Sequence, residues 1–412
     1  MITLYYKLRA KLIPRLLRGM TRRQPMVNRG PGAGPQLCAQ LPLLGFKRVL
    51  LVTDRVLLEI GALDAIKQAL DDADVDFDIY DGVQPDPSFE QVQAGEASLR
   101  TCAGEAVLAV GGGSVLDTAK MISLLHSNGG SLADFAKPKL NRRPGLPLFA
   151  IPTTAGTGSE VTPVAVITNQ QTHEKTAVAD AGMMPAYVAL DPLIMRGMPK
   201  GITAATGMDA LTHAVESFLS RGSDEETERQ ASAAVRLIFR YLPVAWADGD
   251  DLEARDAMAL AAYYAGAAFS RTSVGYAHAI AHQLGRVCGT PHGNANAMVL
   301  PEVLLAYGEC THERLAELAR RAGLGQDGDP PQALARTLID AIVDLRRQMD
   351  MPLLPRGLKH EDLPGIVEEA LSEAGKLYPV PRYLSAAEVG ALVRDLLPAS
   401  QPQELELSPH GN

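Results

Sequence analysis

The histidines of this sequence gather in its second half, at spacings that suit a metal site. Four of the nine histidines fall between residues 213 and 292. Asp209 and His213 are four residues apart in GMDALTHAVE, and His278 and His282 repeat that spacing in YAHAIAHQLG. Residues four apart project from one face of a helix. His292 follows in TPHGNANA. Imidazoles together with a carboxylate suit a divalent ion such as Fe²⁺ or Zn²⁺.

A single histidine on an alanine-rich helix is more often a hydrogen-bonded core residue than a metal ligand. Two pairs at helical spacing, followed by a histidine just beyond a Gly-Thr-Pro turn, favour a shared site instead. The five candidate side chains exceed a tetrahedral set, so one of them has another role. Spacing alone does not say which one.

A run of three glycines predicts a second kind of site. Gly111, Gly112, Gly113 and Ser114 follow an apolar stretch and open the string VLDTAK. Glycines at a strand–helix junction let backbone N–H groups approach a phosphate, and the helix N-terminus favours its negative charge. A tight turn alone would explain one or two glycines, but three in succession favour a ligand.

A second loop, TTAGTGSE over residues 153–160, is rich in hydroxyl groups and follows another apolar stretch. Ligands of open α/β sheets bind outside the carboxyl ends of the strands, so two such loops predict one shared binding crevice. A helix N-cap would explain one of these hydroxyls, but not all of them. Asp54 ends the first clear strand, where it could bind a ribose and disfavour NADP, or simply cap a helix.

The elements that must position these residues change in character near residue 195. Up to that point short apolar stretches alternate with helical periodicity, which indicates parallel βαβ units. Strands are predicted over 47–53, 77–80, 106–110, 148–151, 164–168 and 186–190, and helices over 55–69 and 89–102. From residue 203 the sequence is alanine-rich and helical, with helices predicted over 204–219, 226–241, 252–270, 278–287 and 295–307. We expect an α/β domain over 28–195, an all-helical metal-binding domain over 196–397 and a polar tail over 398–412.

The bulk composition narrows the class of protein. A chain of 412 residues is long enough for two domains, and its net charge of −9 argues against nucleic acid as a partner. No apolar stretch is long enough for a transmembrane helix. Four cysteines without CxxC spacing indicate reduced thiols and a cytoplasmic location.

The first 27 residues form a basic extension. Residues 1–53 carry ten Lys or Arg residues and no acidic residue. Leu4, Leu8, Leu12 and Leu16 recur at helical spacing, which would suit an amphipathic helix on anionic lipid or on an acidic partner. A transit peptide is a weaker alternative. The plainer explanation is an extension that packs on its own protein or frays, and Pro14 would interrupt a long helix.

Several motifs together resemble the iron-containing (group III) alcohol dehydrogenases. They are KRVLLVTD, DGVQPDPS, GGGSVLDTAK, IPTTAGTGSEVT, ATGMDALTHAVES and AHAIAHQLGRVCGTPHGNANAMVLP, and the resemblance spans about residues 30–397. It implies a Rossmann-like N-terminal domain and an all-helical C-terminal domain, an architecture like that of dehydroquinate synthase, with the active site between them. The basic extension lies outside the family pattern. Gln283 stands where the family commonly has proline.

The resemblance also implies roles for individual residues. It places the metal ligands at Asp209, His213, His278 and His292, and it leaves His282 near the nicotinamide to assist proton transfer. It places cofactor contacts at Asp54, Gly111, Gly112, Gly113, Ser114, Asp117, Thr153, Thr154, Thr157 and Lys175.

The expected activity is hydride transfer between a primary alcohol, or its aldehyde, and NAD, with the substrate oxygen on a divalent metal. Fe²⁺ is expected, while Zn²⁺ or Mn²⁺ would also suit the ligands. The resemblance implies a homo-oligomer, with a dimer expected. Alternatives are a polyol or diol dehydrogenase, or a lyase like dehydroquinate synthase, although the Lys and Arg cluster that would grip a phosphate is missing from the metal loops. A metal-dependent hydrolase would leave the glycine loops unexplained. A binding protein without catalytic activity is disfavoured, because a metal site together with a dinucleotide-binding loop suits redox chemistry.

Overall fold

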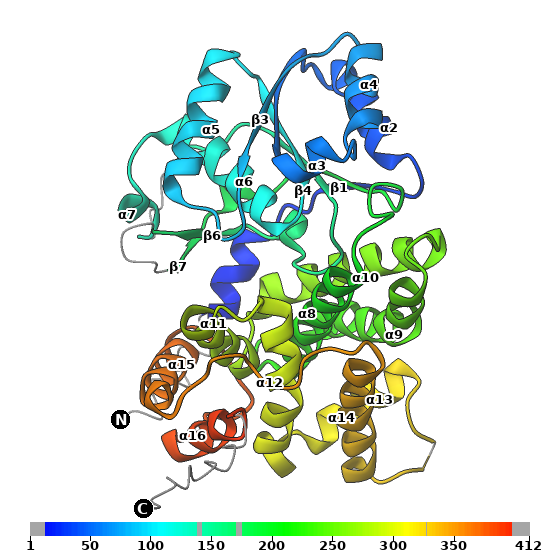
Figure 1. The fold of residues 1–412 in the computed structure, drawn as a ribbon, viewed down its shortest axis with the longest axis vertical. Helices are drawn as coiled ribbons and strands as arrows, with labels where there is room; N and C mark the ends of the chain where they lie inside the picture. The colour runs from blue at the N-terminus through cyan, green and yellow to red at the C-terminus, as the bar shows by residue number, and fades with distance from the viewer. Residues whose placement is uncertain (1–12, 138–141, 170–174, 327, 398–412) are drawn as a thin grey trace, which may run out of the picture.

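The chain folds into an α/β part, at the top of Figure 1, and a helical part below it. The computed structural model describes residues 13–137, 142–169, 175–326 and 328–397. The described strands are β1 (Met26–Arg29), β2 (Arg48–Asp54), β3 (Asp76–Val83), β4 (Ala106–Gly111), β5 (Leu148–Pro152), β6 (Val164–Thr168), β7 (Lys175–Ala179) and β8 (Tyr187–Leu190). The helices of the same part are α2 (Ala33–Gln40), α3 (Arg55–Glu59), α4 (Asp64–Asp72), α5 (Phe89–Thr101), α6 (Gly113–Asn128) and α7 (Leu132–Phe135).

Within these described residues, the strands of the main sheet run parallel in the order β1-β8-β5-β4-β2-β3. Its central strand β4 is buried along its whole length, because helices cover both faces. Alternate residues of the strands point to opposite faces. Val49 and Leu51 of β2 pack with α2 and α4, whereas Leu50 and Val52 join the cluster that contains α5 and α6. The continuous apolar stretches therefore mark a sheet buried on both sides, as parallel sheets are.

Several predicted elements differ from the structure. The helix predicted over 55–69 is two helices, α3 and α4, separated by a turn at Gly61 with φ +73°. The strand at Val164–Thr168 is not part of the main sheet but pairs antiparallel with β7, which was not predicted. β1 and α2 were not predicted either, and β1 begins at Met26, inside the expected extension. Short strands such as β1 and β7 give only a weak periodic pattern in the sequence, which explains why they were not predicted.

The helical part begins with α8, and no strand follows β8 among the residues that the structure describes. Its helices are α8 (Lys200–Leu219), α9 (Glu225–Ala247), α10 (Leu252–Thr272), α11 (Tyr276–Cys288), α12 (His292–Tyr307), α13 (His312–Ala322), α14 (Pro331–Gln348), α15 (Leu363–Leu377) and α16 (Ala386–Arg394). Short alanine side chains let the first of these helices pack closely, and α8 lies against α9, α10 and α12. Within the described ranges no helix is long and apolar enough to cross a membrane.

The two parts meet at close contacts. Gly158, in the second glycine-containing loop, has φ +62°, and a Cβ on it would lie 2.5 Å from the Cα of Gly266 on α10. A side chain at either position would push the loop away from the helix. On β1, the Arg29 guanidinium binds the Asp256 carboxylate of α10 through two hydrogen bonds, 2.5 and 3.0 Å long. The loop after β5 is therefore held against the helical part.

The described portion of the basic extension packs on the helical part. Residues 13–20 are helical. Arg18 donates a 2.8 Å hydrogen bond to the carbonyl of Gly222 and lies 3.2 Å from the Asp224 carboxylate. A Cβ on Gly222 would lie 2.5 Å from Cγ of Pro14, so the segment sits close to the junction of α8 and α9. Leu4, Leu8 and Leu12, on which the lipid-binding interpretation depends, lie outside the described residues.

Candidate metal centre

Three of the five candidate side chains converge at one point between α8, α11 and α12. Ligand atoms of Asp209, His278 and His292 all lie within 4.8 Å of one another. Oδ1 of Asp209 is 3.7 Å from Nε2 of His278 and 3.4 Å from Nε2 of His292. His292, which was expected just beyond a turn, is the first residue of α12. The residues thus come from three helices that lie side by side below the α/β part (Figure 1).

The approach of α12 to α8 depends on a glycine beside the metal centre. Gly293 directly follows His292, and a Cβ on it would lie 2.0 Å from the carbonyl oxygen of Ala205 on α8. No side chain fits in that space. This close backbone contact brings His292 within reach of Asp209.

His213 lies next to this group but outside it. Its ring stacks between Phe269 and His278, with centroids 4.2 and 4.5 Å away. Its Nδ1 is 3.9 Å from Oδ2 of Asp209 and is buried with no hydrogen-bond partner in the described structure. Burial lowers the pKa of His213 to about 4, against the opposing effect of Asp209, so the ring is neutral at pH 7.

The electrostatics of the group favour a cation. Burial alone would lower the pKa of His278, but the nearby carboxylates of Asp209 and Glu216 outweigh burial and raise the pKa to about 9. Nδ1 of His278 is 2.7 Å from Oε2 of Glu216, and this carboxylate also accepts 2.8 Å hydrogen bonds from the backbone N–H groups of Gly275 and Ala277. With Nδ1 donating to Glu216, Nε2 is left facing Asp209, buried and unpartnered in the described structure. A divalent metal that displaced the proton from Nε2 would lie between a nitrogen lone pair and a carboxylate.

Two supporting residues were missed by the sequence reasoning. Glu216 lies seven residues after Asp209 on the same helical face, which is a signal that could have found it. Asn296 lies four residues after His292, and its amide donates a 2.8 Å hydrogen bond to Oδ1 of Asp209. Both residues orient a candidate ligand, which is the usual arrangement around protein-bound metals.

His282 lies beside the group on α11. Its ring is nearly parallel to that of His292, with an angle of 13° between the planes and 5.2 Å between the centroids. Its Nδ1 is 2.7 Å from Oε1 of Glu373, on α15. Glu373 gave no signal in the sequence, because it is 91 residues away from His282.

The two glycine-containing loops face each other at the carboxyl ends of β4 and β5. A Cβ on Gly112 would lie 3.5 Å from Oγ1 of Thr154, and one on Gly113 would lie 2.7 Å from Cγ2 of Thr157. Gly112 is the N-cap of α6 and offers no side-chain cap within the described structure. Gly111 ends β4, Ser114 lies in the first turn of α6, and Thr153 follows β5, with its N–H bonded to the carbonyl of Gly111. An open helix N-terminus lined by hydroxyls fits a pyrophosphate.

The loop after β5 also reaches the metal centre. The backbone of Gly156 is close enough to the His213 ring to raise its pKa slightly, against the stronger effect of burial. A Cβ on Gly156 would lie 2.5 Å from Cβ of Thr206 on α8, so this loop rests directly on the helix that carries Asp209. The glycine loops and the candidate metal centre are therefore neighbours.

The remaining predicted cofactor residues have other partners in the structure. Asp54 caps α3, accepting a 3.0 Å hydrogen bond from the N–H of Leu57. Asp117 accepts hydrogen bonds from the hydroxyl of Ser159, at 2.5 Å, and from the N–H of Val166, at 2.9 Å. Lys175 on β7 binds the carboxylate of Asp86 at 2.6 Å. None of these three side chains is free to bind a cofactor at the glycine turn in this structure, because each already has a hydrogen-bond or ion-pair partner.

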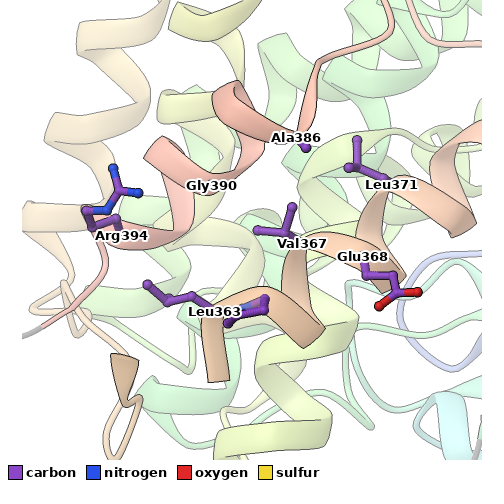
Figure 2. Close-up of a pocket in the computed structure, with 8 residues that line it drawn as sticks. Leu363, Val367, Glu368, Leu371, Ala386, Gly390 and Arg394 are labelled. Carbon is purple, nitrogen blue, oxygen red and sulfur yellow. The ribbon is translucent and has the colours of Figure 1, made fainter. Parts of the chain in front are cut away.

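A groove of about 440 Å³ lies away from these residues, between α15 and α16 (Figure 2). Its lining is mostly apolar, with Glu368 and Arg394 as its charged side chains. It contains none of the candidate metal or cofactor residues.

Comparison with known proteins places the chain in a family. Residues 25–192 match the profile of the iron-containing alcohol dehydrogenases, and residues 203–397 match the C-terminal profile of the same family. The chain is 39% identical to "Alcohol dehydrogenase 4" of Saccharomyces cerevisiae over 84% of this chain and 90% of the yeast protein. It is 35% identical to the "NAD-dependent methanol dehydrogenase" of Bacillus methanolicus over 89% of this chain and 97% of that protein.

Among solved structures, a crystal structure of a 1,3-propanediol oxidoreductase matches with a TM-score of 0.87 at 38% identity, covering 91% of this chain and 98% of that one. The chain belongs to the iron-containing alcohol dehydrogenase family. The resemblance stated from the motifs is confirmed, together with the fold class that it implied.

Proposed function

We propose that this protein interconverts a primary alcohol and its aldehyde with NAD, at a divalent metal held by Asp209, His213, His278 and His292. The observation that carries the proposal is the convergence of Asp209, His278 and His292 within 4.8 Å, next to the glycine loops. The names of the relatives, which include alcohol, methanol and propanediol dehydrogenases, support a small alcohol or diol as substrate. Fe²⁺ is the metal suggested by the family, and the same ligands also suit Zn²⁺ or Mn²⁺.

A bound metal and bound NAD would supply the reactive chemistry. A metal at these ligands would act as a Lewis acid toward an alcohol or aldehyde oxygen, and NAD on the glycine loops would accept or return the hydride. The protein's own residues do the positioning. Glu216 fixes the ring of His278, and the amide of Asn296 holds one oxygen of Asp209. We assign the hydroxyl proton to His282, whose ring lies next to that of His292.

The backbone N–H groups at the start of α6 would bind the pyrophosphate, with Thr153, Thr154 and Thr157 lining the opposite side. Asp54 ends β2 on the same edge of the sheet, where a carboxylate would favour NAD over NADP. Lys175 and Asp117 are proposed as further cofactor contacts, and both would first have to leave their present carboxylate, hydroxyl or backbone partners.

NADH formation tests the function directly. Protein stripped with a chelator would be reloaded with Fe²⁺, Zn²⁺ or Mn²⁺ and assayed with methanol, ethanol and 1,3-propanediol. We expect turnover only after reloading, and His278→Ala should lose both metal and turnover. The control is His360→Ala, at an exposed histidine outside the metal centre. Equal turnover in metal-free protein, or in His278→Ala, would refute the metal-dependent function.

We also propose that this chain forms a dimer and acts in the cytoplasm, as its family suggests. β1 is an outer strand of the sheet, and its Met26 and Val27 are 67% and 39% exposed, so a second copy could pair with this edge. We expect a dimer by light scattering, and Val27→Lys should shift it toward monomer. All four cysteines are free thiols, which supports the reducing cytoplasm as the place of action.

A further inference from the structure

Two carboxylate–imidazole pairs lie on α11, and the metal centre uses one of them. In the first pair, Glu216 holds Nδ1 of His278 at 2.7 Å, which directs Nε2 of that ring to the metal ligands. In the second pair, Glu373 holds Nδ1 of His282 at the same distance of 2.7 Å. The matching distances suggest that Glu373 orients the ring of His282 in the same way that Glu216 orients the ring of His278.

The Glu373 carboxylate is itself firmly held. Its Oε1 accepts a hydrogen bond from the hydroxyl of Tyr378, which is buried. Its Oε2 lies 3.5 Å from the amide nitrogen of Gln283, and Arg286 in turn donates a 3.0 Å hydrogen bond to that amide's oxygen. Gln283 is the position at which this chain departs from the proline common in its family, so the amide contact depends on that departure.

Glu373 is ionised in this setting. Burial would raise its pKa, but the hydrogen bonds from His282 and Tyr378 outweigh burial, and the pKa lies below its ordinary value. An ionised carboxylate can only accept hydrogen bonds. The proton between Glu373 and His282 is therefore on Nδ1, and in the neutral ring Nε2 carries the lone pair.

The second pair differs from the first in its access to solvent. The side chain of His278 is 3% exposed, whereas that of His282 is 36% exposed and lies parallel to the ring of His292. A buried lone pair suits a permanent metal ligand. A lone pair on an accessible ring suits a group that takes up and releases protons.

We propose that Glu373 is a positioning residue, which fixes the ring and the tautomer of His282 so that Nε2 exchanges the proton of the substrate hydroxyl. During oxidation the O–H bond breaks, its proton forms an N–H bond at Nε2, and its electron pair forms the carbonyl as the carbinol carbon gives a hydride to NAD. Reduction runs these steps in reverse. The inference rests on the proposed function, since it names the residue that orients the proton acceptor of that reaction.

The decisive comparison is Glu373→Gln alone and in a His282→Gln background. A glutamine can turn its amide toward Nδ1 and donate to it, which favours the opposite tautomer. We expect Glu373→Gln to lower kcat roughly tenfold or more, within the range of general acid–base catalysis, while metal content and the KM for NAD stay unchanged. Once His282 is already glutamine, Glu373→Gln should lower kcat no further.

Glu369→Gln, the same substitution at an exposed position of α15, is the matched control and should leave kcat unchanged. The proposal fails if the two substitutions lower kcat independently, if His282→Gln alone leaves kcat unchanged, or if Glu373→Gln loses metal and thermal stability in step with activity. The last result would mean that Glu373 only joins α15 to α11.

A spectroscopic measurement separates this proposal from the proposed function. In Zn²⁺-loaded protein with ¹⁵N-labelled histidine, His282 should show the Nδ1–H tautomer, and Glu373→Gln should shift the ring toward Nε2–H. The His282→Gln spectrum assigns the signal. If no alcohol is oxidised but the tautomer changes as expected, the function is wrong and the positioning role of Glu373 survives. An Nε2–H tautomer in the unchanged protein overturns the positioning role whatever the activity.

Discussion

Adding one methyl group at Gly293 should disrupt the metal centre without touching any ligand. A Cβ there would lie 2.0 Å from the Ala205 carbonyl oxygen, whereas real Cβ contacts essentially never fall below 3.0 Å. The start of α12 must therefore move away from α8 by about 1 Å. Metal sites tolerate deviations of only about 0.2 Å in ligand distance. Because His292 is the residue before Gly293, Gly293→Ala should carry this ligand out of reach.

The size of the effect follows from the same displacement. Overpacking of this kind costs about 1–3 kcal/mol of folding free energy. Disturbing a residue that supports a ligand lowers metal affinity about 10–100-fold, and displacing the ligand itself should do at least that. Zn²⁺ affinity would be measured by chelator competition, together with Tm in the presence and absence of Zn²⁺. Turnover should fall with metal content.

Gly201→Ala is the matched control on α8. A Cβ there meets no atom within 4 Å, so the substitution should leave Zn²⁺ affinity unchanged and stabilise the helix by about 0.5–1 kcal/mol at most. If Gly293→Ala binds Zn²⁺ as tightly as the unchanged protein and keeps its Tm, the close contact between α8 and α12 does not position His292.

Further substitutions test other parts of the structure. Burial raises the pKa of Glu160 to about 7. The folded state therefore holds the carboxyl proton of Glu160 more tightly than the unfolded state does. The free energy of unfolding should fall as pH rises from about 4.5 to about 7. Glu160→Gln should flatten that part of the Tm profile, and an unchanged slope would contradict the assignment. Lys120 is fully buried, and its amine donates hydrogen bonds to Ser159, Thr162 and Val164. Lys120→Met should lower the free energy of unfolding, measured in urea, by about 3 kcal/mol or more. The same substitution should weaken NAD binding. A loss below about 1 kcal/mol would mean that water replaces the amine. Arg18→Ala removes a half-exposed ion pair and should cost less than about 1 kcal/mol, whereas a large fall in Tm would show that the extension is an integral part of the fold.

The alternation of strands and helices was readable from the sequence because it depends on local periodicity. Val49 to Val52 and the stretch before Gly111 are apolar without a break, which is the pattern of strands buried on both faces, and the structure confirms them. β1 and β7 were not predicted. Each is a short strand that is stabilised by its partner, β8 or β6, rather than by a pattern of its own.

The candidate ligands were also readable from the sequence, since a spacing of four places two side chains on one helical face whatever the rest of the chain does. Spacing does not determine how far apart two helices lie. The tertiary structure brings Asp209, His278 and His292 together, and it leaves His213 at the side of the group. The contact of Gly293 with the backbone of α8 sets this arrangement, and nothing in the local sequence reveals it.

The two carboxylates that hold histidine rings, Glu216 and Glu373, differ in the same way, because only one of them could have been found from the sequence. Glu216 could have been found, because it lies on the helical face of Asp209 and His213. Glu373 could not, because its helix meets α11 only in the folded chain, 91 residues after His282. The sequence by itself determined which residue types are available for metal and cofactor binding. The packing of α8, α11, α12 and α15 decided which of them meet, since hydrogen bonds and metal coordination depend on distances of a few tenths of an ångström.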